Sequence, residues 1–180
     1  RHVPSKVLEK LPYEAKIELL ESENDLALAV DRLDEARADI ARTKEQIKRA
    51  KERLSAAKDE VGAAQDQTSQ AVAELAVTEA EARVEWLRAH QRSNVREESL
   101  SDKNLECAYA RYELSRPTAA RKAKLEGSET LEPADFEGQV KKCDEQFAEL
   151  KAELKESNVE ADAVRAEWDK AKAALAKKTF

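Results

Sequence analysis

The residues best able to form a covalent bond in this chain are its two cysteines, Cys107 and Cys143. Two cysteines form a disulfide when the fold brings their Cα atoms within about 7 Å of each other. The alternative is a pair of buried free thiols that pack as small apolar side chains. We favour the disulfide, which predicts an oxidising compartment such as a bacterial periplasm or envelope; free thiols would instead suit a cytoplasmic protein.

No other set of residues predicts chemistry. The two histidines, His2 and His90, supply no cluster with the spacing of metal ligands. Acidic residues are plentiful, but they alternate with Lys and Arg at helical spacing, whereas acid–base catalysis needs carboxylates with divergent pKa values in a pocket. The sequence also contains no glycine-rich phosphate loop and no Cys-x-x-Cys motif. We therefore expect a non-enzymatic protein with no catalytic residue, no cofactor and no bound metal.

The composition predicts long helices. Of the 180 residues, 39% are charged and 4% are aromatic, and the chain has only three glycines and four prolines. This bias towards Ala, Glu, Lys, Leu and Arg is typical of helical coiled coils. The net charge of −6, with both signs interleaved, argues against nucleic acid as a ligand. The basic run from Lys44 to Lys51 has acidic partners at (i, i+4) spacing, such as Glu45 for Arg49, and we interpret it as a solvated helix face.

An apolar seam repeats every seven residues from Leu19 to Ala89, with large side chains at one position and mostly small ones three residues later. This spacing is a coiled-coil signature. The segment between residues 19 and 71 contains the part of the seam that we expect to mediate self-association. Its members are Leu26, Ala29, Leu33, Ala36, Ile40, Ile47, Ala50, Leu54, Ala57, Val61 and Ala64.

The boundaries of the expected helices follow from proline, glycine and the heptad phase. After a lead-in over residues 1–12, we predict one long helix over residues 13–116, because the heptad keeps its phase past the single glycine in this segment, Gly62. Pro117 should end that helix, and a connection over residues 117–133 holds a possible short helix over 118–126, closed by Gly127.

The last segment, residues 134–178, carries a second clean heptad and should form the other coiled-coil helix. The predicted fold is therefore all-α: an elongated coiled coil in which a long helix and a shorter antiparallel helix form a hairpin. The alternative is a three-helix bundle with a turn near Gly62, because a lone glycine can mark a turn.

The hairpin has a preferred register, in which Cys107 lies opposite Cys143. Each tryptophan then faces a smaller residue, with Trp86 opposite Val164 and Trp168 opposite Ala82. A register centred on the connection would separate the cysteines by roughly 15 Å along the axis, too far for a disulfide. The predicted hairpin core consists of Trp86, Leu100, Leu114, Phe136, Phe147, Leu150, Val164 and Trp168.

In this register the second helix covers the first only from about Val72 onwards. The seam over residues 19–71 then lacks a partner in the same chain, and burying it is the reason to expect an antiparallel homodimer. A second apolar strip near the hairpin tip, which includes Leu105, Tyr109 and Tyr112, lies off the main seam. We interpret it either as packing against residues 118–126 or as a patch that binds a protein partner.

No run of the sequence approaches the roughly 20 apolar residues of a membrane span. The chain begins at Arg1 and contains no methionine, so we expect a processed or excised piece. Membrane attachment would require an N-terminal anchor that this sequence does not contain.

Three functions remain from these observations. The first is a structural spacer, scaffold or oligomerisation element, placed by the cysteines in a bacterial cell envelope. In composition and helical pattern the chain is similar to the helical hairpins of envelope lipoproteins and periplasmic adaptor proteins, although no motif assigns it to either family. The second is a compact helical bundle that binds another protein, and the third is a lipid-surface or chaperone-like helical protein, which the acidic balance disfavours.

Overall fold

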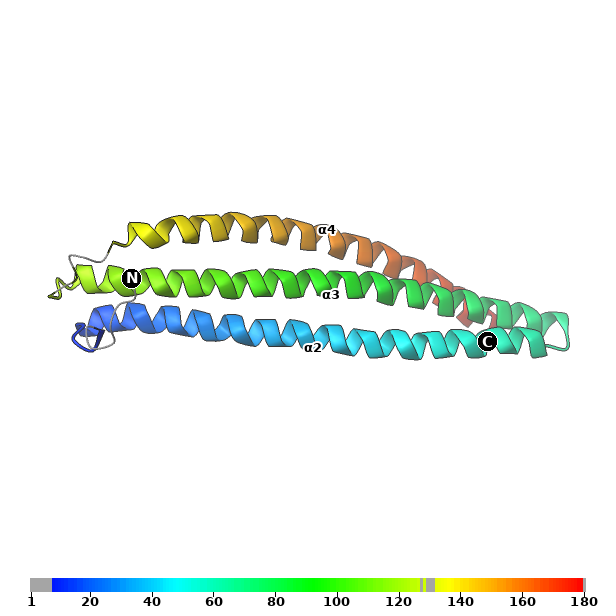
Figure 1. Ribbon diagram of the computed structural model, residues 1–180. Helices are drawn as coiled ribbons and strands as arrows, with labels where there is room; N and C mark the ends of the chain where they lie inside the picture. The colour runs from blue at the N-terminus through cyan, green and yellow to red at the C-terminus, as the bar shows by residue number, and fades with distance from the viewer. Residues whose placement is uncertain (1–7, 127, 129–131, 180) are drawn as a thin grey trace. The chain divides into compact units, whose positions relative to one another are not determined.

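The computed structural model describes residues 8–126, 128 and 132–179. Nearly all of them belong to helices α2 (Tyr13–Ala63), α3 (Gln67–Lys122) and α4 (Ala134–Thr179) (Figure 1). Within these described ranges there is no β-strand. The all-α class is therefore confirmed, and α4 matches the helix expected over residues 134–178.

The chain divides into two units, and each unit contains part of all three helices. Unit 1 comprises residues 1–35 and 98–152, and unit 2 comprises residues 36–97 and 153–180. In unit 1, α3 lies between α2 and α4 (Figure 1). The order of the contacts in this unit shows that α2 and α3 are antiparallel: Ser22 bonds to Ser115 at 3.0 Å, while Glu18, nearer the start of α2, pairs with Lys122.

A short turn over residues 64–66 separates α2 from α3, and Asp66 begins the second helix. One carboxylate oxygen of Asp66 accepts hydrogen bonds from the backbone N–H groups of Thr68 and Ser69, both at 2.9 Å. The Ser69 hydroxyl lies 3.4 Å from the backbone nitrogen of Asp66, which completes a reciprocal capping arrangement. Hydrogen bonds from Ser69, backbone and side chain, lower the pKa of the Asp66 carboxyl below its ordinary value of 3.8.

The unbroken helix expected over residues 13–116 is therefore wrong, and the alternative with a turn near Gly62 is confirmed. Gly62 itself is still helical, in the last turn of α2. The break follows from Asp66, whose side chain replaces the hydrogen bonds that the first N–H groups of α3 lack. The segment predicted as one helix therefore forms two helices, α2 and α3, and Asp66 caps the start of the second.

Pro117 lies inside α3, so the prediction that it ends the helix is wrong, as is a separate short helix over 118–126. The Pro117 side chain is almost fully buried, and the neighbouring Ala119 and Ala120 are buried with it. Burial of this segment outweighs the helical hydrogen bond that proline removes, whose loss costs about 3 kcal/mol in an exposed helix. In the same turn the Thr118 hydroxyl donates a hydrogen bond to the Leu114 carbonyl oxygen, at 2.7 Å.

The end of α3 is capped at Lys124, whose φ of 51° is left-handed. The Leu125 N–H bonds to the Ala120 carbonyl at 3.2 Å, and the Lys124 N–H bonds to the Arg121 carbonyl at 2.9 Å. This pair of bonds is a Schellman motif, a common way to satisfy the last carbonyls of a helix. This cap lies three residues before Gly127, the residue expected to close a short helix over 118–126; Gly127 itself lies outside the described residues.

The seam predicted for α4 matches its buried face. Apart from Gln146, the described side chains of α4 that are not exposed occupy the two expected heptad positions and no others. They are Phe136, Val140, Cys143, Phe147, Leu150, Leu154, Ser157, Ala161, Val164, Trp168, Ala171 and Leu175. A seven-residue repeat therefore identifies the packed face of this helix correctly.

Candidate functional site

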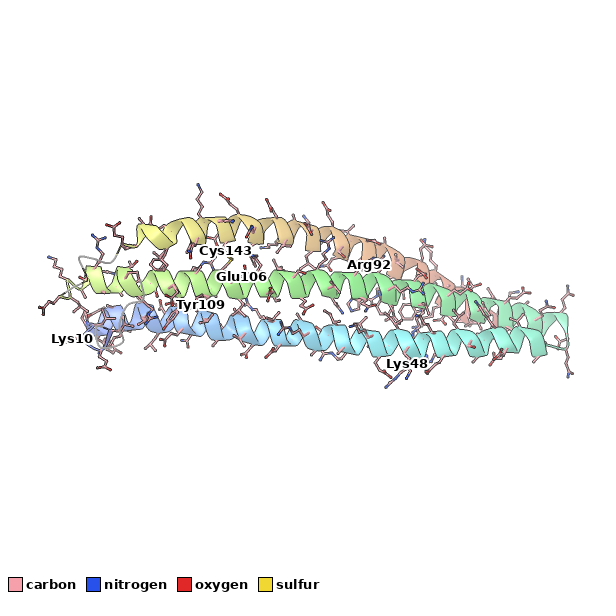
Figure 2. The ribbon with its side chains drawn as sticks, in the orientation of Figure 1. Lys10, Lys48, Arg92, Glu106, Tyr109 and Cys143 are labelled. Carbon is pink, nitrogen blue, oxygen red and sulfur yellow. A yellow bond between two sulfur atoms is a disulfide. The ribbon has the colours of Figure 1, made fainter. Side chains whose placement is uncertain are left out.

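Cys107 and Cys143 form a disulfide between α3 and α4 in unit 1, as predicted. The S–S bond is 2.03 Å long and the Cα atoms are 5.5 Å apart, within the usual range. Cys107 is 1% exposed and Cys143 is 8% exposed, so the bond is buried. Figure 2 shows Cys143 on the side of α4 that faces α3. Arg111 of α3 pairs with Asp144 of α4 next to this bond, at 2.5 Å.

The α3–α4 register continues in unit 2 close to the predicted one. Ser93 of α3 donates a hydrogen bond to the side-chain oxygen of Asn158 of α4. Arg92 and Arg96 of α3 form exposed ion pairs with Glu160 and Glu153 of α4, respectively. Exposed pairs of this kind contribute little to stability, about 0–1 kcal/mol, but they agree with the register that the disulfide sets.

The tryptophans differ from the prediction. Each was expected to face a smaller residue, but Trp86 of α3 and Trp168 of α4 stack on each other, with ring centroids 4.7 Å apart. Arg83 lies 5.6 Å from the ring centroid of Trp168, and the Trp168 indole N–H donates to Glu79 at 2.5 Å. A half-buried stacked pair with a nearby cation is a stabilising contact of unit 2, and it uses the polar edge of the indole as well as its face.

The remaining predicted core residues of the hairpin lie in the helix–helix interface to different degrees. Leu100 is buried at 8% exposure. The others are half-buried: Trp86, Leu114, Phe136, Phe147, Leu150, Val164 and Trp168. Leu114 and Val140 line an open hollow of about 580 Å³ on the surface of unit 1. The predicted core is therefore a contact strip that keeps part of its apolar surface near water.

The seam predicted for self-association is packed inside the chain. Ala29, Leu33 and Ala36 are at most 5% exposed, and Ala50 is 2% exposed. The other members are buried or half-buried: Leu26, Ile40, Ile47, Leu54, Ala57, Val61 and Ala64. The expectation that this seam lacks a partner in the same chain is wrong, because the turn at residues 64–66 returns α3 onto α2. The antiparallel homodimer stays a prediction, but it loses the reason given for it.

The partner of the α2 seam is a second heptad on α3 that the sequence reasoning missed. In unit 2, Ile47 and Ala50 of α2 cluster with Val84 and Leu87 of α3, and Thr43 accepts a hydrogen bond from Asn94 at 2.8 Å. The repeat that contains these α3 residues also has the buried members Ala73, Ala80, Ser101, Ala108 and Ala119. Polar residues within this repeat, such as Asn94 and Ser101, interrupt its apolar pattern in the sequence.

Part of the strip proposed as a partner patch belongs to this second heptad. Tyr112 packs against a cluster that includes Leu11, Ala15 and Ala119, and its hydroxyl lies 3.3 Å from Glu23 of α2. Burial raises the pKa of the Tyr112 phenol above 10.0. Leu105 is half-buried, and only Tyr109 is well exposed, at 54%. Ala123 and Leu125 pack against the same cluster, so Tyr112 shares a cluster with residues of the 118–126 segment, in line with the first of the two interpretations.

Four of the exposed large apolar side chains lie together on the outer side of α2 in unit 1. Tyr13, Ile17, Leu20 and Leu28 are 75%, 39%, 54% and 53% exposed. Their spacing puts them on one side of the helix, opposite the buried residues of the α2 seam. The sequence contained this signal as an i, i+4, i+7 set on the side opposite the main seam, but the stronger heptad hid it.

The basic run and the surface hollows show no organised polar site. Lys44, Lys48, Arg49 and Lys51 are exposed, and Figure 2 shows Lys48 on the side of α2 away from α3. Arg49 pairs with Glu45 at 3.2 Å, as expected of a solvated face. A nearby open hollow of about 540 Å³ is lined by side chains of both charges: Gln46, Arg49, Ala50, Glu52, Arg53, Ala56 and Arg83.

Among the residues that the structure describes, no group of three or more His, Cys, Asp or Glu side chains could hold a metal ion. None of the described helices is both long and apolar enough to cross a membrane.

Comparisons with protein-family models, with curated proteins and with solved structures return no match for this chain. The function is therefore argued from the chain's own contacts and surfaces.

Proposed function

We propose that this chain is a non-enzymatic helical protein that binds another protein and works in an oxidising compartment, such as a bacterial periplasm. The observation that supports it most is the internal burial of the α2 seam, with Ala29, Leu33, Ala36 and Ala50 packed away from water. A chain that covers its own seam does not need a second copy to become stable. Its remaining apolar surface is then available for a different partner.

The disulfide supports the proposal of an oxidising compartment. A buried bond between Cys107 and Cys143 persists in secreted and periplasmic proteins, whereas the cytosol keeps most thiols reduced. Rapid alkylation of the protein in its source cells, followed by mass spectrometry, measures the redox state directly. Protection of both cysteines supports an envelope or periplasmic location, and alkylation of both favours the cytoplasm.

A structural spacer or scaffold is the second candidate, supported by the seven-residue repeats on all three helices. The two functions differ in the expected assembly. Size-exclusion chromatography with light scattering should give a mass near 20.2 kDa for the binding module. A mass of twice that value, kept after dilution, would instead support the antiparallel homodimer and the scaffold.

A lipid-surface or chaperone-like role is the third candidate, and the acidic balance of the chain weakens it. Helices that lie on membranes carry Lys and Arg beside their apolar face, which attract anionic lipids. Flotation with anionic vesicles tests this function: recovery of the chain with the vesicles would favour it over protein binding.

A further inference from the structure

The outer side of α2 in unit 1 combines an apolar stripe with a row of acidic side chains. The stripe consists of Tyr13, Ile17, Leu20 and Leu28. From its first to its last member it extends about 22 Å along the helix. We propose that this stripe is a docking surface for an amphipathic helix of another protein, with basic residues beside its apolar face. This inference rests on the proposed function and names the partner's chemistry.

The apolar part of the surface has the spacing that helix-in-groove and helix-on-helix recognition uses. Tyr13, Ile17 and Leu20 are at positions i, i+4 and i+7, so a partner helix can place its own i, i+3, i+4 and i+7 residues against them. Tyr13 is also the kind of residue that dominates binding energy, because it offers a large rigid apolar area with a polar end. Between Leu20 and Leu28, the exposed Asn24 and Ala27 leave room for side chains of the partner.

The acidic side chains beside the stripe indicate a partner with positive charge. Glu14, Glu21 and Asp25 lie along one edge of the stripe and are exposed. They form no ion pair with any residue that the structure describes. The charged residues of α2 between Tyr13 and Glu35 are all acidic except Lys16 and Arg32. A partner with Lys or Arg beside its apolar face would gain complementary charge and a faster association rate.

The same acidic edge argues against two other occupants. A second copy that docked through this surface would place Glu14 and Glu21 near the same acidic residues of its partner, and like charges at an interface are unfavourable. An anionic lipid surface would be repelled for the same reason. Both occupants are outcomes of the experiment below.

The test uses a labelled synthetic helix of about 18 residues, roughly five turns, with leucines at i, i+3, i+4 and i+7 and lysines beside them. A matched peptide has glutamates in place of the lysines. Binding to the 180-residue chain is measured by fluorescence anisotropy, and the bound surface is mapped by amide chemical-shift changes. We expect the lysine peptide to bind, the glutamate peptide to bind at least about tenfold more weakly, and the shift changes to centre on residues 13–28.

Variants then test the surface itself. Ile17→Ser with Leu20→Ser should weaken binding of the lysine peptide by about tenfold or more, since both residues lie at the centre of the stripe. Val159→Ser is the matched apolar control, because Val159 is 63% exposed but belongs to unit 2. Glu14→Gln with Glu21→Gln should weaken binding about threefold or more at low salt and reduce its salt dependence, with Glu156→Gln as the acidic control. Thermal melting checks that each variant remains folded.

The results separate the possible occupants. Shift changes outside residues 13–28, or equal binding of both peptides, would overturn the proposal. Concentration-dependent dimerisation that Leu20→Ser abolishes would assign the stripe to a second copy, and vesicle binding that Leu20→Ser abolishes would assign it to lipid. A monomeric chain that binds neither peptide refutes this surface only, whereas a stable dimer unaffected by Leu20→Ser refutes the monomeric binding module.

Discussion

Reducing the disulfide should destabilise unit 1 by an amount that its position in the chain determines. Cys107 and Cys143 are separated by 36 positions. The chain-entropy model gives about 3–4 kcal/mol for a loop of this length, because the bond restricts the unfolded chain. Reduction leaves two thiols in a buried site that suits a small apolar side chain, so it adds little packing loss of its own. The expected loss is thus close to the entropic value.

Two measurements detect this loss of stability. In thermal melting monitored by circular dichroism, a change of this size should lower the midpoint by roughly 6–16 °C in excess reductant. In native-state amide exchange, the amides of α4 within unit 1, residues 134–152, should lose more protection than those of α2 within unit 2, residues 36–63. Residues 36–63 of α2 are the internal control, because the disulfide does not connect this segment to another helix.

The double variant Cys107→Ala with Cys143→Ala is the matched control for the reductant. It should melt at the lower midpoint whether or not reductant is present. The reasoning is refuted if reduction of the wild-type chain moves the midpoint by less than about 2 °C, or less than about 1 kcal/mol in free energy of unfolding. It is also refuted if protection falls equally in residues 134–152 and 36–63.

Three further predictions concern the Asp66 cap, the tryptophan pair and the left-handed Lys124. Asp66→Ala should lower stability at neutral pH because Thr68 and Ser69 lose the acceptor of their N–H groups. The Asp66 carboxyl of the wild type should titrate below 3.8 by NMR. Its contribution to the free energy of unfolding is then complete above pH 3.8 and is lost as the pH falls through the lowered pKa. A titration midpoint at or above 3.8 contradicts this prediction. The single and double alanine variants of Trp86 and Trp168 should show a coupling energy of about 1 kcal/mol in urea unfolding, whereas additive effects would contradict a stacked pair. Lys124→Gly should raise the free energy of unfolding by about 1 kcal/mol, because glycine adopts the left-handed conformation without strain, and an unchanged urea midpoint would count against that capping geometry.

The sequence predicted which residues are buried better than it predicted what covers them. The heptads of α2 and α4 match the buried faces, because a seven-residue repeat reports a helix side directly. The pairing of Cys107 with Cys143 was also predictable, since only one antiparallel register brings them together. The identity of the helix that covers the α2 seam depends on where the chain turns, and periodicity carries no information about that.

The turn was missed because two different seams happened to join in phase. Val61 belongs to the face of α2 that packs on α3, whereas Leu75 and Ala82 belong to the side of α3 that faces α4. Their seven-residue spacing across the turn suggested one continuous helix, although Thr68 between them is exposed. The informative signal was Asp66, followed three residues later by Ser69, which is a capping pattern. These capping residues, rather than Gly62, indicate where the helix breaks.

The two buried sides of α3 in unit 2 explain why the seams of α2 and α4 are covered within the chain. Its two repeats are offset by two residues, as in Val84 and Trp86, and a two-residue step places them on opposite sides of a helix. One side packs on the α2 seam and the other on the α4 seam, so neither seam needs a second chain. Any partner must therefore use a face that these repeats do not bury. On the outer side of α2, Ile17 and Leu20 lie beside Glu21, whose carboxylate pairs with no residue that the structure describes. Apolar area and available negative charge therefore occur together, and this combination favours a basic helix over a second copy of the chain.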